Sequence, residues 1–170
     1  NGNGAVRPTD QPGGIHPARI VSELNAALPP DAIICLDVGD HVLWFNRHFQ
    51  GSGQDVLISG TWRTMGFALP AALAAKLVYP HRKVVAITGD GGLSMCLPEV
   101  ATAVQHQLPV AIVLFQNGVL GTESHLARIE GWQPIGTRLE NPDFTRLVGA
   151  FGGAGFVVRR PEQIRPQGQA

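Results

Sequence analysis

The chain has 170 residues, of which 44% are hydrophobic, and its formal net charge is zero with histidine neutral. This length is enough for one domain with a sizeable core, and the lack of a basic surplus argues against a protein that grips nucleic acid through charge. No apolar run reaches the roughly 18 residues of a membrane span, and Cys35 and Cys96 predict neither a disulfide framework nor a zinc site, so we expect a soluble protein of the cytoplasm.

Composition divides the chain into three parts. The polar, glycine-rich residues 1–15 predict a linker or flexible lead, and the proline-interrupted residues 161–170 predict a truncated or disordered tail. Between them, apolar blocks alternate with polar turns throughout residues 16–160. We therefore expect a single folded domain over this middle part.

The first elements alternate between helix and strand. Apolar residues at helical spacing predict a helix over 16–28, and the apolar run 32–36 predicts a strand. A short helix over 42–49 and a short strand over 56–58 are expected next.

The middle of the chain continues this alternation. The alanine-rich segment 66–79 predicts a buried helix that Pro80 ends, and apolar runs over 83–88 and 110–115 predict two buried strands joined by a helix over 97–107. Uniformly apolar strands are typical of parallel strands covered by helices on both faces. We therefore predict an α/β fold of three layers, a parallel sheet flanked by helices, with ligands bound outside the carboxyl ends of the strands.

The C-terminal part is less regular. The polar stretch 122–141 predicts a mobile loop of a length often found in lids. We expect Asn141 to cap a helix over 142–151, and residues 155–158 to form a last strand.

The stretch Gly89-Asp90-Gly91-Gly92 directly follows a predicted buried strand. One interpretation is an ordinary turn that uses glycine for positive φ. Another is a turn whose N–H groups approach a phosphate, with Asp90 holding a divalent cation between the two negative groups. A dinucleotide-binding fingerprint is a third interpretation, but the acidic residue expected about 20 positions later is missing, as is a Walker lysine.

A second oxygen ligand, Asn117, ends the next apolar run, about one strand–helix–strand unit after Asp90. The pair Asn117-Gly118 is also compatible with a type I′ turn, although such turns join antiparallel strands. Because the carboxyl ends of parallel strands meet at one edge, we expect Asp90 and Asn117 to ligate one cation there. Met65 suits core packing as well as a site role, and His41 with His48 is a weak metal signal.

Several segments together carry a family resemblance. Gly89-Asp90-Gly91, then 25 residues, then Asn117 resembles the thiamine diphosphate-binding motif. Residues 64–72 resemble the segment GTMGFGLPAA of acetolactate synthase large subunits, 37–44 resemble their DVGQHQMW, and 98–110 resemble their ELATAVQHNLPV. Residues 16–160 thus resemble the C-terminal diphosphate-binding domain of thiamine diphosphate-dependent enzymes, most like acetolactate synthase.

The resemblance implies thiamine diphosphate and Mg²⁺ as cofactors. The metal ligands would be the side-chain oxygens of Asp90 and Asn117 and the backbone carbonyl of Val119. The residues that the resemblance places around the diphosphate are Gly39, Asp40, His41, Gly89, Gly91, Gly92, Gly121 and Thr122.

The resemblance also implies contacts to the two rings of the cofactor. Met65 would wedge between the rings, and the carbonyl of Arg63, next to Thr64, would accept a hydrogen bond from the 4′-amine. Two of these positions depart from the family: Arg63 stands where it has glycine, and Asp40 where it has glutamine. The segment 121–125 also differs from the synthase sequence GMVRQW.

The implied activity is decarboxylation and carboligation of 2-keto acids such as pyruvate. The family's catalytic glutamate comes from a pyrimidine-binding domain of a neighbouring subunit, so we expect no catalytic residue in this chain, an inactive isolated domain, and a homo-oligomer, either dimer or tetramer. FAD is implied only if the full-length protein has a middle domain. A 2-keto acid decarboxylase or another carboligase is an alternative, and a non-catalytic nucleotide- or phosphate-binding module is a weaker one.

Overall fold

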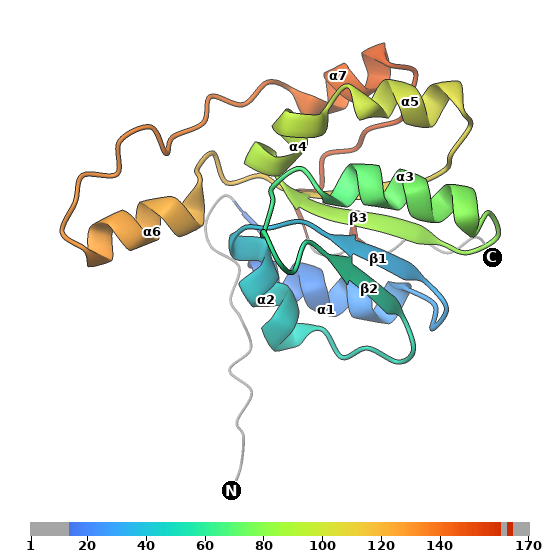
Figure 1. The fold of residues 1–170 in the computed structure, drawn as a ribbon, viewed down its shortest axis with the longest axis horizontal. Helices are drawn as coiled ribbons and strands as arrows, with labels where there is room; N and C mark the ends of the chain where they lie inside the picture. Colours follow the sequence, from blue (N-terminus) through green and yellow to red (C-terminus); the bar gives the residue numbers. More distant parts are fainter. Residues whose placement is uncertain (1–13, 161–162, 165–170) are drawn as a thin grey trace, which may run out of the picture.

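The computed structural model describes residues 14–160 and 163–164, and in them helices and strands alternate along the chain (Figure 1). The elements are α1 (Pro17–Ala27), β1 (Ile33–Leu36), α2 (Asp40–His48), β2 (Asp55–Ile58), α3 (Ala68–Val78), β3 (Val84–Gly89), α4 (Asp90–Cys96), α5 (Glu99–Gln105), β4 (Ala111–Phe115), α6 (Gly121–Ile129) and α7 (Phe144–Ala150).

Within the described residues, four parallel strands form one sheet in the order β2-β1-β3-β4. Leu36 at the end of β1 pairs with Ile87, and Gly89 at the end of β3 pairs with Phe115. The carboxyl ends of β1, β3 and β4 therefore meet at one edge, where ligands of such sheets bind.

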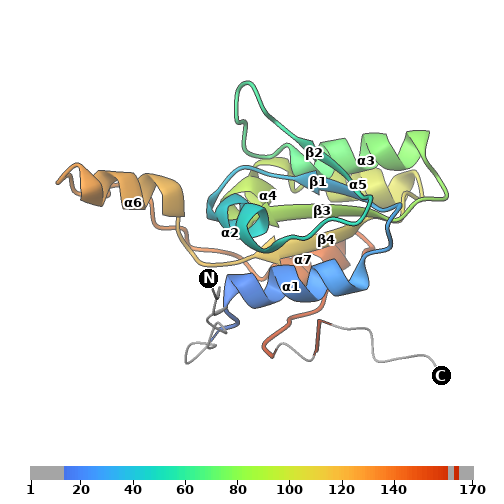
Figure 2. The same ribbon diagram turned by 90° about the horizontal axis from the view of Figure 1, so that it is seen from below.

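Helices cover both faces of the sheet (Figure 2). On one face, α1 and α2 pack on β1 and β3 through a buried cluster that includes Val21, Leu24, Val42, Phe45, Ile34 and Ile87. On the other face, α3, α4, α5 and α7 share a second cluster of Leu69, Leu73, Leu93, Val100 and Phe144. The predicted three-layer α/β fold is confirmed.

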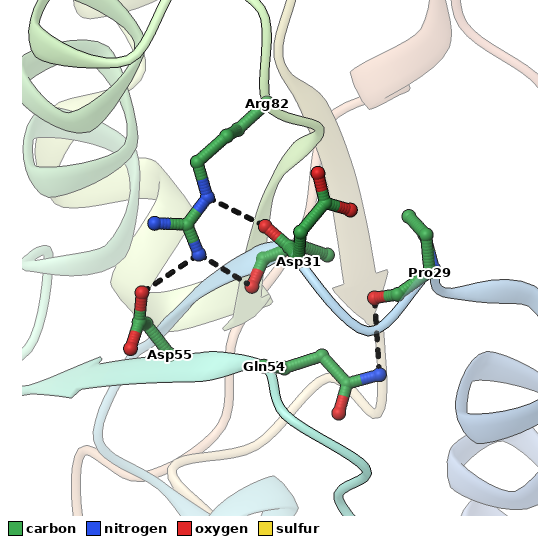
Figure 3. Close-up of polar contacts among 6 residues, drawn as sticks. Pro29, Asp31, Gln54, Asp55 and Arg82 are labelled. Carbon is green, nitrogen blue, oxygen red and sulfur yellow. Dashed lines mark hydrogen bonds and ion pairs between the residues drawn. The ribbon is translucent and has the colours of Figure 1, made fainter.

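The amino ends of the strands are tied together by Arg82 (Figure 3). Its Nε donates to the carbonyl of Asp31 at 2.6 Å, and its Nη2 pairs with the Asp55 carboxylate at 2.7 Å. Beside it, Gln54 Nε2 donates to the carbonyl of Pro29 at 3.1 Å. These contacts anchor the exposed edge strand β2 at the sheet edge opposite the predicted site.

The helix α3 begins at Ala68 and not at residue 66 as predicted. Gly66 has a φ of +79°, which is outside the helical region. The N–H groups of Gly66 and Phe67 instead donate to the carboxylate of Asp37, at 3.2 and 3.3 Å. A buried side chain from the end of β1 thus sets where α3 starts.

A helix occupies part of the predicted mobile loop over 122–141. Residues 121–129 form α6, so the loop prediction is wrong there. In both views α6 extends away from the three layers (Figures 1 and 2). Ser124 is its buried residue, whereas Leu126 and Ile129 are exposed, so this helix covers little of the core.

Two further predictions for the C-terminal part are wrong. Asn141 does not cap α7; Asp143 does, and its carboxylate accepts the N–H of Thr145 at 3.0 Å. Residues 155–158 form no strand, and Phe156 is 85% exposed. Gly153 lies against Val148 and Gly155 against Thr145, so the chain runs back beside α7 up to Gly155, and residues 155–158 join no strand of the sheet.

The predicted lead over 1–15 and tail over 161–170 lie outside the described residues, except for 14–15 and 163–164. In the part of the chain that is described, no helix is long and apolar enough to cross a bilayer. Cys35 and Cys96 are both free thiols.

Candidate functional site

Three loops converge at the carboxyl edge of the sheet. The turn after β1 carries Gly39 to His41, β3 runs into Asp90, and Asn117 follows β4. A side chain from each loop reaches the next: the His41 ring lies against Gly89, and the Asp90 carboxylate contacts the Asn117 loop. The predicted site residues from these loops therefore lie together.

The Asp90 carboxylate is the centre of this site and is 2% exposed. Its Oδ1 accepts the N–H of Gly91 at 3.0 Å. Its Oδ2 accepts the N–H groups of Asn117 and Gly118, at 3.2 and 2.7 Å, and the side-chain amide of Asn141 at 2.6 Å. These four donors are neutral, so they stabilise the buried carboxylate without cancelling its charge.

The Asn117 loop is shaped by its own side chain. Asn117 Oδ1 accepts the N–H of Val119 at 3.1 Å, which forms an Asx turn. Gly118 has a φ of +70°, but Asn117 does not have positive φ, as a type I′ turn requires at both central residues. The type I′ interpretation is therefore wrong, and the side-chain oxygen of Asn117 faces its own loop.

The segment after α6 pairs with this loop. Leu139 donates its N–H to the carbonyl of Gly118 at 2.9 Å, and Leu120 donates to the carbonyl of Thr137 at 2.8 Å. These two bonds flank Val119, whose own carbonyl is not used in the pairing. The carbonyl remains free of this ladder and available to a ligand.

The donor set at this edge suits a hard divalent cation. It combines one buried carboxylate, one amide oxygen and one backbone carbonyl, from Asp90, Asn117 and Val119. The described residues hold no group of three or more His, Cys, Asp or Glu side chains placed to bind a metal. The oxygen set therefore fits Mg²⁺ or Ca²⁺ better than a softer metal.

Gly91 and Gly92, which follow β3, are closely packed against neighbouring segments. None of Gly89, Gly91 and Gly92 has positive φ, so the interpretation as an ordinary positive-φ turn is wrong. A Cβ on Gly91 would lie 2.7 Å from Leu120, and a Cβ on Gly92 would lie 2.5 Å from the Asp37 carboxylate. The chain enters α4 at Asp90, and its glycines let three neighbouring segments approach.

Asp37, which the sequence singles out only as part of the segment 37–44 in the family resemblance, is a buried polar residue of the site. It is fully buried, and its Oδ2 accepts the hydroxyl of Thr88 at 2.7 Å in addition to the N–H of Gly66. It thereby joins the ends of β1 and β3 to the segment before α3. The signal in the sequence was a carboxylate placed directly after an apolar strand.

The segment 63–65 lies against the glycine stretch. A Cβ on Gly91 would come within 3.1 Å of the Met65 methyl group, so Met65 reaches the start of α4. Thr64 donates its N–H to the Ser59 hydroxyl at 3.1 Å. Arg63 is exposed and has a φ of +50°, the left-handed region that favours glycine.

His41 is buried behind the site. Its Nε2 lies 3.1 Å from the carbonyl of Asp37, and its ring stacks on Phe115 with centroids 5.9 Å apart. Burial lowers the pKa of His41 below its usual value, although the charges of Asp37, Asp40 and Asp90 partly oppose this shift. Burial thus favours the neutral form of His41, and a ring nitrogen of this side chain lies beside Gly89.

Asp40 turns away from the glycine stretch and toward α6. Its Oδ1 accepts the hydroxyl of Thr122 at 2.8 Å, and its carboxylate fills the space that a Cβ on Gly121 would need. His48, the other histidine of α2, is exposed and stacks on Trp44. The structure thus joins Asp40 to Gly121 and Thr122, and it does not pair His48 with His41.

A family model described as "Thiamine pyrophosphate enzyme, C-terminal TPP binding domain" matches residues 37–170. The chain belongs to the thiamine pyrophosphate enzyme family. This TPP-binding domain is 35% identical over 153 residues to the putative thiamine pyrophosphate-containing protein YdaP of Bacillus subtilis, covering 89% of the chain and 27% of that relative. It is 34% identical over 165 residues to the acetolactate synthase isozyme 2 large subunit of Escherichia coli, covering 91% and 29%.

Solved structures agree with the fold of the TPP-binding domain. The thiamine diphosphate-dependent 4-hydroxybenzoylformate decarboxylase of Rhodococcus jostii RHA1 superposes with a TM-score of 0.82 and 27% sequence identity, over 92% of this chain and 30% of that one. The predicted family and its fold are confirmed. The chain spans less than a third of each of these three relatives.

Proposed function

We propose that the chain is the cofactor-binding domain of a thiamine diphosphate- and Mg²⁺-dependent enzyme acting on 2-keto acids, of the acetolactate synthase type. The observation that carries this proposal is the contact between the buried Asp90 carboxylate and the backbone N–H groups of Asn117 and Gly118, 27 and 28 positions away, in a chain of this family. Asp90 Oδ1, Asn117 Oδ1 and the Val119 carbonyl would hold Mg²⁺, which would bridge to the diphosphate.

The remaining predicted residues would bind and orient the cofactor. Backbone groups of the three loops would hold the diphosphate, namely those of Gly39, Asp40, His41, Gly89, Gly91, Gly92, Gly121 and Thr122. Met65 would hold the two rings in a bent arrangement, and the carbonyl of Arg63, beside Thr64, would accept a hydrogen bond from the 4′-amine. When bound there, thiamine diphosphate would supply an electron sink for decarboxylation.

The complete active site would include more than this chain. We propose that residues 16–160 are the diphosphate-binding domain and that a glutamate-bearing pyrimidine-binding domain of a neighbouring subunit completes it, in a cytoplasmic homo-oligomer, dimer or tetramer. The isolated chain would then bind cofactor weakly. FAD would be present only with a middle domain.

Calorimetry with thiamine diphosphate and Mg²⁺ tests the cofactor assignment, with NAD and ATP as competing ligands. We expect binding that EDTA abolishes, and a loss of at least about tenfold in affinity in both Asp90→Ala and Asp90→Asn, because the charge that holds the cation is gone. The matched control is Asp31→Ala, an exposed carboxylate at the opposite edge of the sheet. Unchanged affinity in the Asp90 variants would contradict the metal site, and tighter binding of NAD or ATP would favour a nucleotide-binding module.

A simple 2-keto acid decarboxylase is the second candidate. It is supported by the similarity to a 4-hydroxybenzoylformate decarboxylase and by the departure of residues 121–125 from the synthase sequence. Product analysis of the full-length enzyme separates the two, because a synthase releases acetolactate from pyruvate and a decarboxylase releases free aldehyde.

A further inference from the structure

The two oxygens of the Asp90 carboxylate are hydrogen-bonded unequally. Oδ2 accepts from Asn117, Gly118 and Asn141, whereas Oδ1 accepts from Gly91. A carboxylate oxygen offers about two lone-pair sites. Oδ2 is therefore saturated, and Oδ1 is the oxygen with capacity for one more bond.

Of these four donors, Asn141 alone uses a side chain, and it lies 51 positions after Asp90. The chain holds it from both sides. Before it, Leu139 pairs with the Gly118 carbonyl at 2.9 Å, and after it, Asp143 caps α7. The half-buried Asn141 amide is thus placed at the carboxylate by contacts of its neighbours in the chain, which do not depend on the amide itself.

We propose that Asn141 is a positioning residue of the cation site: its amide saturates Oδ2 and thereby fixes the rotation of the Asp90 carboxylate, with Oδ1 directed to the cation. This inference rests on the proposed function, because it requires Asp90 to ligate Mg²⁺. Hydrogen-bond partners behind a metal ligand change metal affinity by about 10–100-fold when they are removed.

The same contact joins the segment after α6 to the metal site. Residues 121–136 form an excursion whose two ends are closed by the pairing of Leu120 with Thr137 and of Gly118 with Leu139. Asn141 extends this closure to Asp90 itself. A cation bound at Oδ1 strengthens the orientation that Asn141 stabilises, so cation binding and the placement of this excursion are coupled.

The test measures Mg²⁺ affinity directly in the full chain. Mg²⁺ is titrated into ¹⁵N-labelled protein at saturating thiamine diphosphate, and the amide signals of Asn117 and Gly118 report binding. Asn141→Ala removes the amide, Asn141→Leu removes it at similar side-chain volume, and Asn141→Gln keeps a donor. Asn25→Ala is the matched control, because Asn25 Oδ1 accepts the N–H of Gln50 at 2.9 Å, far from the site.

We expect Asn141→Ala and Asn141→Leu to raise the Mg²⁺ dissociation constant about tenfold or more, Asn141→Gln to restore part of the affinity, and Asn25→Ala to leave it unchanged. An unchanged dissociation constant in the Ala and Leu variants, with wild-type binding intact, overturns the inference and leaves the proposed function standing; Asn141 is then only a structural tie. A wild-type chain without any Mg²⁺-dependent shift overturns the proposed function, and the inference with it.

Discussion

At the scale of single residues, the site is held together by side-chain oxygens that accept hydrogen bonds from backbone N–H groups. The Asp37 carboxylate accepts the N–H of Phe67 directly before α3. The Asp90 carboxylate accepts the N–H of Gly118, and Asn117 Oδ1 accepts the N–H of Val119. Asp37 and Asp90 are buried and Asn117 is exposed, and no buried side-chain N or O atom among the described residues lacks a partner. Such satisfied networks are rigid, which is what a site for a charged cofactor needs.

Arg63 is one of two non-glycine residues with positive φ among the described residues, and this leads to a prediction about stability. Its φ of +50° lies in the left-handed region, where a side chain costs about 1–2 kcal/mol relative to ordinary conformations. We expect Arg63→Gly to raise the free energy of unfolding, measured by urea titration, by at most about 1 kcal/mol. Relief of the strain stabilises the folded chain, and the greater backbone freedom of glycine in the unfolded chain offsets part of that gain.

Gln107 provides the comparison for Arg63, because its φ is +51° at the end of α5, away from the site. Gln107→Gly is expected to stabilise the chain to a similar degree. If Arg63→Gly is destabilising while Gln107→Gly is stabilising, the Arg63 side chain makes contacts that outweigh its strain. A strained arginine beside a proposed cofactor site is typical of a functional constraint on its guanidinium.

At the scale of elements, two phenylalanines allow a comparison of the helix α7 with the predicted strand over 155–158, which does not form. Phe144 of α7 is 5% exposed, and Phe156 in the predicted strand is 85% exposed. We expect Phe144→Ala to lower the free energy of unfolding by about 3–5 kcal/mol, because it leaves a cavity between α3, α5 and α7. Phe156→Ala should cost less than about 0.5 kcal/mol, as surface substitutions do.

The measurement for both variants is chemical denaturation followed by circular dichroism, with equal m-values as the check that the same unit unfolds. A large loss in Phe156→Ala would mean that residues 155–158 pack as a strand after all.

Element types in the sheet and its flanking helices were predictable, because uniformly apolar runs and helical spacing report burial directly. The predicted strands over 32–36 and 83–88 correspond to β1 and β3. The loop prediction over 122–141 was wrong over α6, whose apolar Leu126 and Ile129 stand among polar residues and are exposed instead of covering the core. The strand prediction over 155–158 failed because a β-prone run forms a strand only beside a partner edge.

The site was predictable in its outline but not in its connections. Strand ends and spacing were enough to bring Asp90 and Asn117 to one edge of the sheet. The contact of Asn141 with Asp90 spans 51 positions and depends on how the segment after α6 folds back. Local sequence carries no signal for such a contact, whereas an asparagine directly before a predicted helix is a favoured N-cap, so the sequence predicts a cap at Asn141.

At the scale of the whole molecule, the proposed function makes this chain one half of a catalytic site. The candidate ligands for cation and diphosphate all lie at the carboxyl edge of one sheet, and the predicted catalytic glutamate is expected from another domain. The relatives it matches are more than three times its length, since it covers 27%, 29% and 30% of three of them. Binding and turnover should therefore be separable in this protein.

The last prediction concerns that separation. With thiamine diphosphate and Mg²⁺ at concentrations where binding is measured, we expect the isolated chain to show no turnover of pyruvate, assayed as CO₂ and as acetolactate. The physical reason is that proton transfer at the cofactor requires an acid–base group within hydrogen-bond reach, and in our proposal that glutamate belongs to a neighbouring subunit. Turnover by the isolated chain that disappears in Asp90→Ala would show that the chain supplies its own acid–base group, and the half-site proposal would then be wrong.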